Sequence, residues 1–244
     1  MAERERVQLE RGFVLHQRAY LNTSQLIECV TAHHGVIGLV AQGSRRRSSG
    51  RRAVLQPFSP LRLSWIRHTD LGRLTGVEAA GPALGLSGDG LFAGFYVNEL
   101  VMRLMARGDA NEAAYSCYSR CLADLVTATA TARAVRLFEL RLLQALGYGI
   151  ELEYEVDTGT PIRPDGRYRF QPEHGFSSCV EPGRGADSYR GSELISLREE
   201  RLDDARSLRA AKRLLTQSLN VYLGERPLRS RSILEDVVAR ELNT

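Results

Sequence analysis

The residues whose type and spacing most clearly point to a chemistry are five arginines within eight consecutive positions of the segment 43–52. They are Arg45, Arg46, Arg47, Arg51 and Arg52. Cations at this density repel one another and cannot be buried without partners, so the segment is predicted to be an exposed, mobile loop. A guanidinium group forks onto phosphate oxygens and stacks on bases. The loop therefore predicts contact with a nucleic acid, and the alternative is a loop that only aids solubility.

Few aromatic residues accompany these cations. Tyr20 falls in a predicted turn and is the candidate for stacking on a base, whereas Trp65 is in phase with neighbouring strand leucines and is expected in the core. Arg18 extends the candidate DNA-binding set, and Arg62 and Arg67 are weaker additions. So few aromatics favour binding led by phosphate contacts, with little sequence preference.

No set of residues predicts catalysis. His33 and His34 lie near Cys29, but neighbouring residues of a strand point to opposite faces and no carboxylate stands at a useful spacing. The chain has neither a phosphate-binding loop ending in Lys-Ser/Thr nor a G-x-S-x-G nucleophile motif. We therefore expect a protein that is not an enzyme and that holds no metal and no cofactor.

The bulk composition is that of an ordinary globular protein with an uneven charge. The 244 residues are 43% hydrophobic and 25% charged, with a net charge of +4. Residues 1–80 carry 12 arginines and 6 acidic residues, whereas the remainder carries 21 basic and 23 acidic residues. A basic first third facing a polyanion is the simplest interpretation. No membrane span or secretory signal is apparent, so we expect a cytoplasmic, nucleoid-associated protein with reduced cysteines.

The first 80 residues are predicted to be β structure. Strand-like segments fall at 12–18, 24–30, 36–40, 61–66 and 74–80, and turn residues separate them. Five short strands in so short a length fit a small barrel. Gly81 and Pro82 then break the chain and mark the predicted boundary between a domain of residues 1–80 and a domain of residues 81–244.

The second domain is predicted to be mostly helical, so the fold class is α+β. Helical spacing of apolar residues appears from 86 to a stop at Gly108, over 112–126, over 132–146, over 192–223 with a break near 202–203, and from about 230 to 242. Between them, residues 151–190 are an irregular Gly/Pro-rich insertion with a short β-like piece.

Several short motifs are spread over most of the chain. They are GFVLH at 12–16, LVAQGSRR at 39–46, LQPFSPL at 55–61, YVNEL at 96–100, RLFEL at 136–140 with LGYG at 146–149, LRAAKR at 208–213 and PLRSR at 227–231. In their order and spacing they resemble the RecO family of DNA repair proteins. None is diagnostic alone, but their common order is specific.

The resemblance implies an N-terminal OB-fold, a helical C-terminal domain and the role of a recombination mediator. It implies binding of single- and double-stranded DNA and annealing of complementary strands. It also implies partnership with RecR and with the acidic, apolar tail of single-stranded DNA-binding protein, and through them the loading of RecA. For that tail, Arg136 matches a position the family uses, and Arg133 lies on the same predicted helix. The alternative for Arg136 is an intrahelical pair with Glu139, and for Phe138 and Leu140 it is ordinary core.

The chain departs from the family in its insertion. Some members carry a four-cysteine zinc site there, but residues 151–190 contain only Cys179, so no structural zinc is expected. A small hairpin packing Tyr168, Phe170 and Phe176 is predicted in its place. Two other functions remain open: a helical adaptor for protein assembly with incidental nucleic-acid affinity, and a nucleic-acid enzyme whose site is not recognised.

Overall fold

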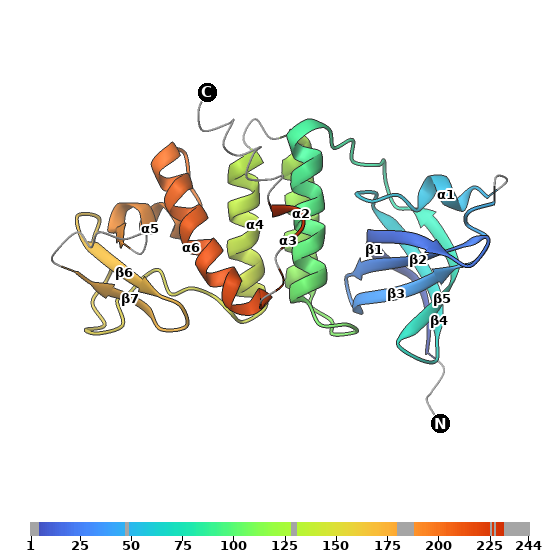
Figure 1. Cartoon of the computed structure of the whole chain (residues 1–244), viewed down its shortest axis with the longest axis horizontal. Helices are drawn as coiled ribbons and strands as arrows, with labels where there is room; N and C mark the ends of the chain where they lie inside the picture. The colour runs from blue at the N-terminus through green and yellow to red at the C-terminus, as the bar shows by residue number, and fades with distance from the viewer. Residues whose placement is uncertain are drawn as a thin grey trace. The chain divides into compact units, whose positions relative to one another are not determined.

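The structure is a computed structural model that describes residues 5–46, 49–127, 131–179, 188–224, 226 and 228–231. The chain divides into two compact units. The first is Met1–Ala128 with Leu228–Leu234, and the second is Thr129–Pro227 with Glu235–Thr244. A five-stranded sheet comes first and a mostly helical region follows, which agrees with the predicted α+β class (Figure 1). No helix within the described residues is both long enough and apolar enough to cross a membrane.

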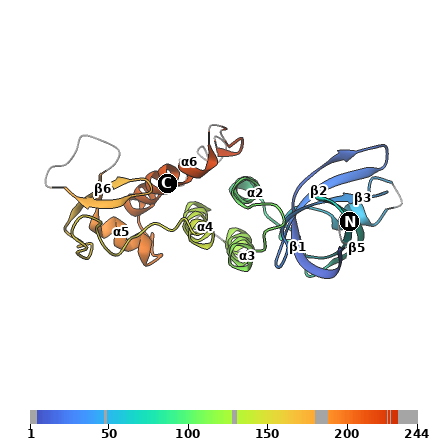
Figure 2. The ribbon, with the colours of Figure 1, turned by 90° about the horizontal axis from the view of Figure 1, so that it is seen from below.

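The five predicted strands are confirmed and form a closed barrel, which Figure 2 shows nearly end-on. They are β1 (Glu5–Tyr20), β2 (Ser24–Thr31), β3 (Gly35–Ala41), β4 (Leu61–Arg67) and β5 (Leu71–Ala79). Their order around the barrel is β1-β2-β3-β5-β4. Antiparallel pairing of β1 with β4 and parallel pairing of β3 with β5 close it.

The barrel interior is filled by one side of each strand, and on β4 these residues alternate with polar ones. On β4, Leu61, Leu63 and Trp65 are almost fully buried, and Arg62 between them is exposed. Trp65 is therefore a core residue, as its phase in the sequence predicts. The remaining buried members of this cluster are Val14, Ile27, Cys29, Ile37, Leu39, Ala41, Leu55 and Leu74.

Strand β1 is the longest of the five and pairs with two neighbouring strands. It begins at Glu5 rather than at the predicted Gly12, and it pairs with β4 over its first half and with β2 over its second. The register against β4 shifts between Val7 and Glu10, where Leu9 has a φ of +52° and is 51% exposed. Irregularities of this kind bend a strand, which is how one strand can follow a barrel wall.

A short helix that the sequence did not predict, α1 (Arg51–Val54), lies between β3 and β4. Two of the predicted helices complete the first unit, namely α2 (Gly88–Leu104) and α3 (Glu112–Thr127). At Gly94 of α2, an added Cβ would lie 2.8 Å from Leu86 and 2.9 Å from Phe58, so glycine permits the close packing there.

Asn98 joins the helix pair to the barrel. Its Nδ2 donates to the backbone oxygen of Leu15 on β1 at 2.8 Å, and its Oδ1 accepts from the hydroxyl of Tyr118 on α3 at 2.7 Å. Asn98 and Tyr118 are buried, and the Tyr118 ring packs edge-on against Phe13 with centroids 5.3 Å apart. The asparagine in the YVNEL motif is thus a structural link between three elements.

The chain returns to the first unit near its end. Glu99 of α2 accepts hydrogen bonds from the backbone N–H of Arg229 and from the backbone N–H and hydroxyl of Ser230. Partial burial opposes ionisation of this carboxyl, but these hydrogen bonds outweigh it and lower the pKa of Glu99. Apart from its first residues Ser230 and Arg231, the helix predicted over 230–242 lies outside the described residues.

The second unit contains α4 (Thr131–Ala145), α5 (Gly191–Arg198) and α6 (Ala205–Leu223), which confirm the other predicted helices. The break expected near Leu202 and Asp203 is present, and Leu202 has a φ of +43°. Asp204 caps α6, because its carboxylate accepts from the backbone N–H groups of Arg206 and Ser207.

An aromatic cluster holds the Gly/Pro-rich insertion together. β6 (Arg167–Gln171) and β7 (Gly175–Ser178) form the predicted hairpin, and β8 (Ser188–Arg190), which the sequence did not predict, pairs with the other edge of β6. Tyr168, Phe170, Phe176 and Tyr189 are buried, with the rings of Phe170 and Phe176 4.9 Å apart. This packing supplies a core to a segment that has only one cysteine.

Candidate nucleic-acid interface

The basic segment starts as a tight turn directly after β3. The buried Ser44 donates its hydroxyl to the backbone oxygen of Ala41 at 2.9 Å. Gly43 has a φ of +67°, and the backbone N–H of Arg46 donates to its oxygen at 3.1 Å. Because the serine faces inward, the side chains of Arg45 and Arg46 are left exposed.

Arg45 ties this turn to the hairpin turn between β1 and β2, residues 21–23. Its backbone N–H donates to the oxygen of Thr23 at 3.0 Å, and its guanidinium Nη1 lies 3.5 Å from the oxygen of Leu21. Tyr20, at the end of β1, is 39% exposed, and Arg18 on the same strand is also exposed. The structure thus brings the hairpin end that carries Tyr20 next to Arg45, a contact that the sequence did not reveal.

The second half of the basic segment enters α1. Arg52 is exposed, whereas Arg51 is half-buried and donates from Nη2 to the backbone oxygen of Thr75 on β5 at 3.1 Å. Arg47 lies outside the described residues. The predicted exposure is therefore confirmed for Arg45, Arg46 and Arg52, and contact of any of them with DNA stays a prediction.

The weaker candidates on β4 have contacts within the barrel. Arg67 forms an ion pair with Glu5 at 2.7 Å, which neutralises its charge locally. Arg62 donates from Nη1 to the backbone oxygen of Leu9 at 3.3 Å. Arg18, Arg45, Arg46 and Arg52 are exposed and have no ion pair among the described residues, so they remain the first candidates for holding phosphate oxygens.

The two arginines predicted to bind a partner tail lie on α4 in the second unit. Arg136 is 4% exposed, and its Nη1 lies 2.7 Å from the Glu139 carboxylate. Arg133 is more accessible, but it donates to the backbone oxygens of Arg201 and Glu200 at 2.7 and 2.6 Å. The intrahelical pair that the sequence left open for Arg136 is thus present, and Phe138 and Leu140 are buried.

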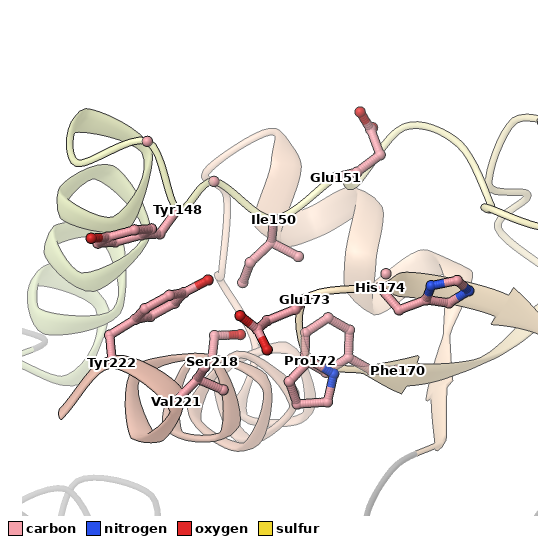
Figure 3. Close-up of a pocket in the computed structure, with 13 residues that line it drawn as sticks. Tyr148, Ile150, Glu151, Phe170, Pro172, Glu173, His174, Ser218, Val221 and Tyr222 are labelled. Atoms are coloured by element: carbon pink, nitrogen blue, oxygen red, sulfur yellow. The ribbon is translucent and has the colours of Figure 1, made fainter. Parts of the chain in front are cut away.

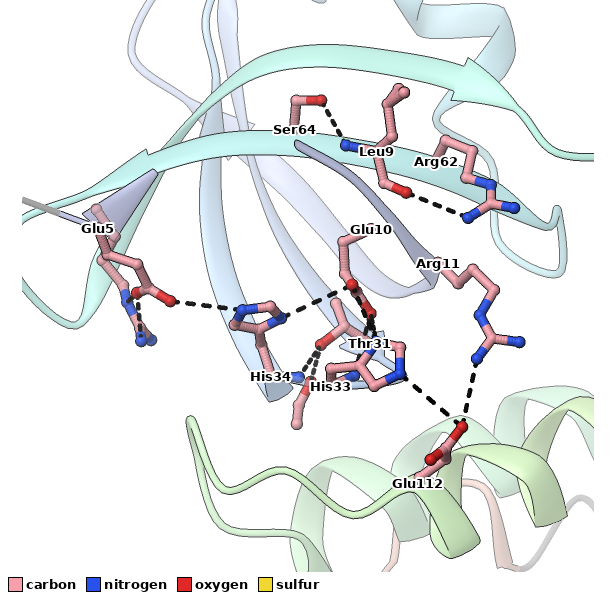
Figure 4. Close-up of polar contacts among 12 residues, drawn as sticks. Glu5, Leu9, Glu10, Arg11, Thr31, His33, His34, Arg62, Ser64 and Glu112 are labelled. Atoms are coloured by element: carbon pink, nitrogen blue, oxygen red, sulfur yellow. Dashed lines mark hydrogen bonds and ion pairs between the residues drawn. The ribbon is translucent and has the colours of Figure 1, made fainter. Parts of the chain in front are cut away.

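A histidine cluster corrects one step of the sequence argument (Figure 4). His33 and His34 do not belong to a strand but to the turn between β2 and β3, and both face the buried carboxylate of Glu10. The Nδ1 atoms of His33 and His34 lie 3.0 and 3.9 Å from Glu10 oxygens. Across the described ranges, no group of three or more His, Cys, Asp or Glu side chains is placed to hold a metal ion.

A cavity of about 440 Å³ lies in the second unit between the β6–β7 turn and the end of α6 (Figure 3). Tyr148 and Tyr222 stack along one side with ring centroids 4.0 Å apart, and Glu173 points into the cavity. Loss of hydration, with the nearby negative charge of Glu173, raises the pKa of Tyr222. The sequence did not predict this cavity, although Tyr148 belongs to its LGYG motif.

An apolar cavity of about 560 Å³ lies in the first unit and was also not predicted. Leu15, Phe92, Phe95 and Met102 contribute to its lining, and the two phenylalanines are 42% and 45% exposed. Exposed apolar surface of this kind is typical of contacts with other proteins.

Comparison with known proteins gives one consistent result. The family description "Recombination protein O N terminal" matches residues 6–83, and "Recombination protein O C terminal" matches residues 86–232. The chain is 44% identical over 232 residues to a "DNA repair protein RecO" of Nitrosococcus oceani, which covers 95% of this chain and 94% of that one. It is 40% identical over 228 residues to the protein of the same name from Methylococcus capsulatus, covering 93% of each chain. The corresponding protein of Actinobacillus pleuropneumoniae is 37% identical over 235 residues, covering 96% and 97%.

Proposed function

The chain belongs to the RecO family, which gives it a role in DNA repair and recombination, and from that premise we propose that it is a DNA-binding mediator without catalytic chemistry. It binds single- and double-stranded DNA and anneals complementary strands. With RecR, it helps to load RecA onto strands coated by single-stranded DNA-binding protein. It works in the cytoplasm at the nucleoid.

The observation that carries the proposal is the exposure of Arg45, Arg46 and Arg52 after β3, with Arg45 bonded to the β1–β2 turn. We propose that the barrel is an OB-fold, because five strands close it in the order β1-β2-β3-β5-β4. In OB-folds, the loop between the first two strands is one of those that bind oligonucleotides. Arg45, which contacts the turn between the first two strands, therefore lies beside a loop at which such a barrel takes its ligand.

The chemistry expected of this surface is neutralisation of phosphate charge. Each guanidinium that replaces a condensed counterion adds affinity without reading the base. Tyr20, on the same hairpin, offers a ring on which any base can stack. Neutralised phosphates also repel a second strand less, which favours annealing of complementary strands.

The partner sites are proposed for the second domain, residues 81–244, as distinct from the DNA-binding domain of residues 1–80. Arg136 and Arg133 remain the proposed contacts for the acidic tail of single-stranded DNA-binding protein. Support comes from the cationic character of α4 and from the 41% exposure of the Arg133 side chain. Binding through Arg136 requires its pair with Glu139 to open, so Arg133 is the first contact expected.

The test is a titration of labelled oligo-dT over a series of salt concentrations. The variant carries alanine at Arg45, Arg46, Arg51 and Arg52. Each lost phosphate contact should reduce the slope of log K against log salt by about 0.7, so a drop of several such steps is expected. The matched control carries alanine at four arginines of the second unit, namely Arg163, Arg169, Arg198 and Arg201, and should keep the wild-type slope.

Two results would count against the proposal. If the basic-segment variant kept its slope while the control lost it, the DNA site would lie in the second unit. If neither the wild type nor the variants bound oligo-dT, the chain would be a protein adaptor, the alternative that its exposed apolar cavity favours.

A further inference from the structure

The hairpin turn between β1 and β2 presents a leucine to solvent. Leu21 is 74% exposed, the largest exposed fraction among the large hydrophobic residues that the structure describes. It stands at the end of the hairpin, directly after the pair formed by Tyr20 and Ser24. A leucine at this place hides little of its surface from water and so adds little to the stability of the barrel.

The backbone of Leu21 is also unfavourable. Its φ is +52°, in the left-handed region where a Cβ crowds the following carbonyl oxygen. Glycine or asparagine is the usual residue in such a conformation. Leu21 therefore combines backbone strain with an exposed apolar side chain, a combination that folding alone does not favour.

Arg45 holds this turn in place. Its two contacts, from the backbone N–H to the oxygen of Thr23 and from the guanidinium to the oxygen of Leu21, join the hairpin turn to the basic segment. A strand whose phosphates lie on Arg45 and Arg46 would bring its bases close to the leucine side chain. The position of Leu21 is thus coupled to the phosphate-binding residues.

We propose that Leu21 is a wedge that enters between neighbouring bases of bound DNA and unstacks them, with Tyr20 stacking on a base that the wedge exposes. Its ligand is the base step of a single strand or of a frayed duplex end. Apolar wedges are an established way in which proteins unstack bases. Leucine offers no hydrogen bond, so the wedge accepts any base. This inference rests on the proposed DNA binding and adds to it a specific action on the bases.

The test uses single-stranded DNA that carries 2-aminopurine between two adenines, because the fluorescence of this base rises when it is unstacked. At saturating wild-type protein, the fluorescence is expected to rise. Leu21→Gly and Leu21→Asn should lose most of this rise and bind about tenfold more weakly, by analogy with the loss of one base-stacking contact. The slope of log K against log salt should stay at the wild-type value, because the arginines are intact.

Leu9 provides a matched control (Figure 4). It is the same residue type, has the same φ of +52° and is 51% exposed, but it lies at the β1–β4 register shift rather than in the hairpin turn. Leu9→Gly relieves the same backbone strain and should keep the full fluorescence rise. The thermal midpoint of Leu21→Gly should equal or exceed that of the wild type, which would exclude unfolding as the cause of its loss.

The possible outcomes separate the wedge from DNA binding itself. Salt-dependent binding by the wild type without a fluorescence rise, or a rise that survives Leu21→Gly, would overturn the wedge and leave DNA binding intact. Equal losses in Leu9→Gly and Leu21→Gly would also overturn it. Failure of the wild type to bind the DNA at all would overturn the proposed function and the wedge together.

Discussion

Arg136 Nη1 lies 2.7 Å from a carboxylate oxygen of Glu139 one turn along α4, and the two side chains are only 4% and 0% exposed. The Nε of Arg136 is also buried and makes no hydrogen bond within the described residues. A buried ion pair adds little stability over an apolar pair, but removal of one member alone is strongly destabilising. The RLFEL motif therefore contains a buried ion pair in which single replacements should be costly.

Arg136→Ala should destabilise the second unit by about 3–5 kcal/mol, because it breaks a buried ion pair by removing one member. Urea unfolding followed by circular dichroism measures the loss. The double variant Arg136→Leu with Glu139→Leu should recover most of it. A single variant as stable as the wild type would show that the pair is open in solution.

This coupling also affects any test of tail binding on α4. Arg136→Ala is expected to weaken affinity for the acidic tail of single-stranded DNA-binding protein and to leave affinity for naked DNA nearly unchanged. Arg133→Ala, whose side chain is 41% exposed, tests the same surface with less structural damage. Fluorescence anisotropy of a labelled tail peptide gives both values. Unchanged tail affinity in both variants would exclude this surface.

Replacement of Asn98 should weaken the link between the barrel and its helices. Asn98→Leu leaves the hydroxyl of Tyr118 and the oxygen of Leu15 without their partner, at a cost of about 1–3 kcal/mol for each buried group. Tyr118→Phe removes only one of the two bonds and should cost less. Thermal unfolding of both variants measures the difference, and equal costs would show that the Leu15 bond contributes nothing.

Stability should depend on acid through Glu155. Hydrogen bonds from Thr158, then Thr160 and Ser178, lower the pKa of this carboxyl from 4.5 to about 2. Because the pKa in the folded state is depressed, the contribution is fully present above pH 4.5 and is lost as the pH falls toward 2. Glu155→Gln should show a smaller loss of thermal midpoint between pH 6 and pH 3 than the wild type. The control variant Glu153→Gln, at an exposed neighbouring position, should lose as much thermal midpoint over this pH range as the wild type.

The cysteines should differ in their reactivity. None of the four, all within the described residues, forms a disulfide, as the sequence predicts, and burial raises the pKa of the Cys29 thiol, with Glu28 adding to the shift. Thiolate is the reactive form, so an alkylating reagent should modify the partly exposed Cys117 and Cys179 first. Mass spectrometry after timed exposure reads the order. Early modification of Cys29 in folded protein would contradict the buried placement.

The elements of this fold were largely predictable, because each depends on a local pattern. Strand-like composition between turn residues located the five strands, with clear alternation only over 61–66, and helical spacing located the longer helices of the described residues. The helix α1 was missed because the charge of Arg51 and Arg52 masked a single helical turn. Strand β8 was missed because it pairs with β6, which is distant in sequence, and no local sequence pattern predicts that pairing.

The candidate site was predictable only in part, for the same reason. The density of arginines identified Arg45, Arg46 and Arg52 as exposed cations, but the bond of Arg51 to Thr75 is a contact between distant segments. His33 and His34 were misjudged because a turn, unlike a strand, turns two neighbouring side chains toward one carboxylate. The left-handed backbone of Leu21 was not predictable, because leucine rarely adopts that conformation. The neighbouring Asn22 is the residue type for which a left-handed backbone would be expected.

The bond between Leu15 and Asn98 has a consequence for folding during synthesis. The two residues are 83 positions apart, and the ribosome adds roughly 5–20 residues per second. Several seconds therefore pass between translation of β1 and arrival of the amide that it needs. Until α2 and α3 have been synthesised, the backbone oxygen of Leu15 lacks the Asn98 amide and the Phe13 ring lacks Tyr118, so the barrel acquires its helical cover only after its last strand is made.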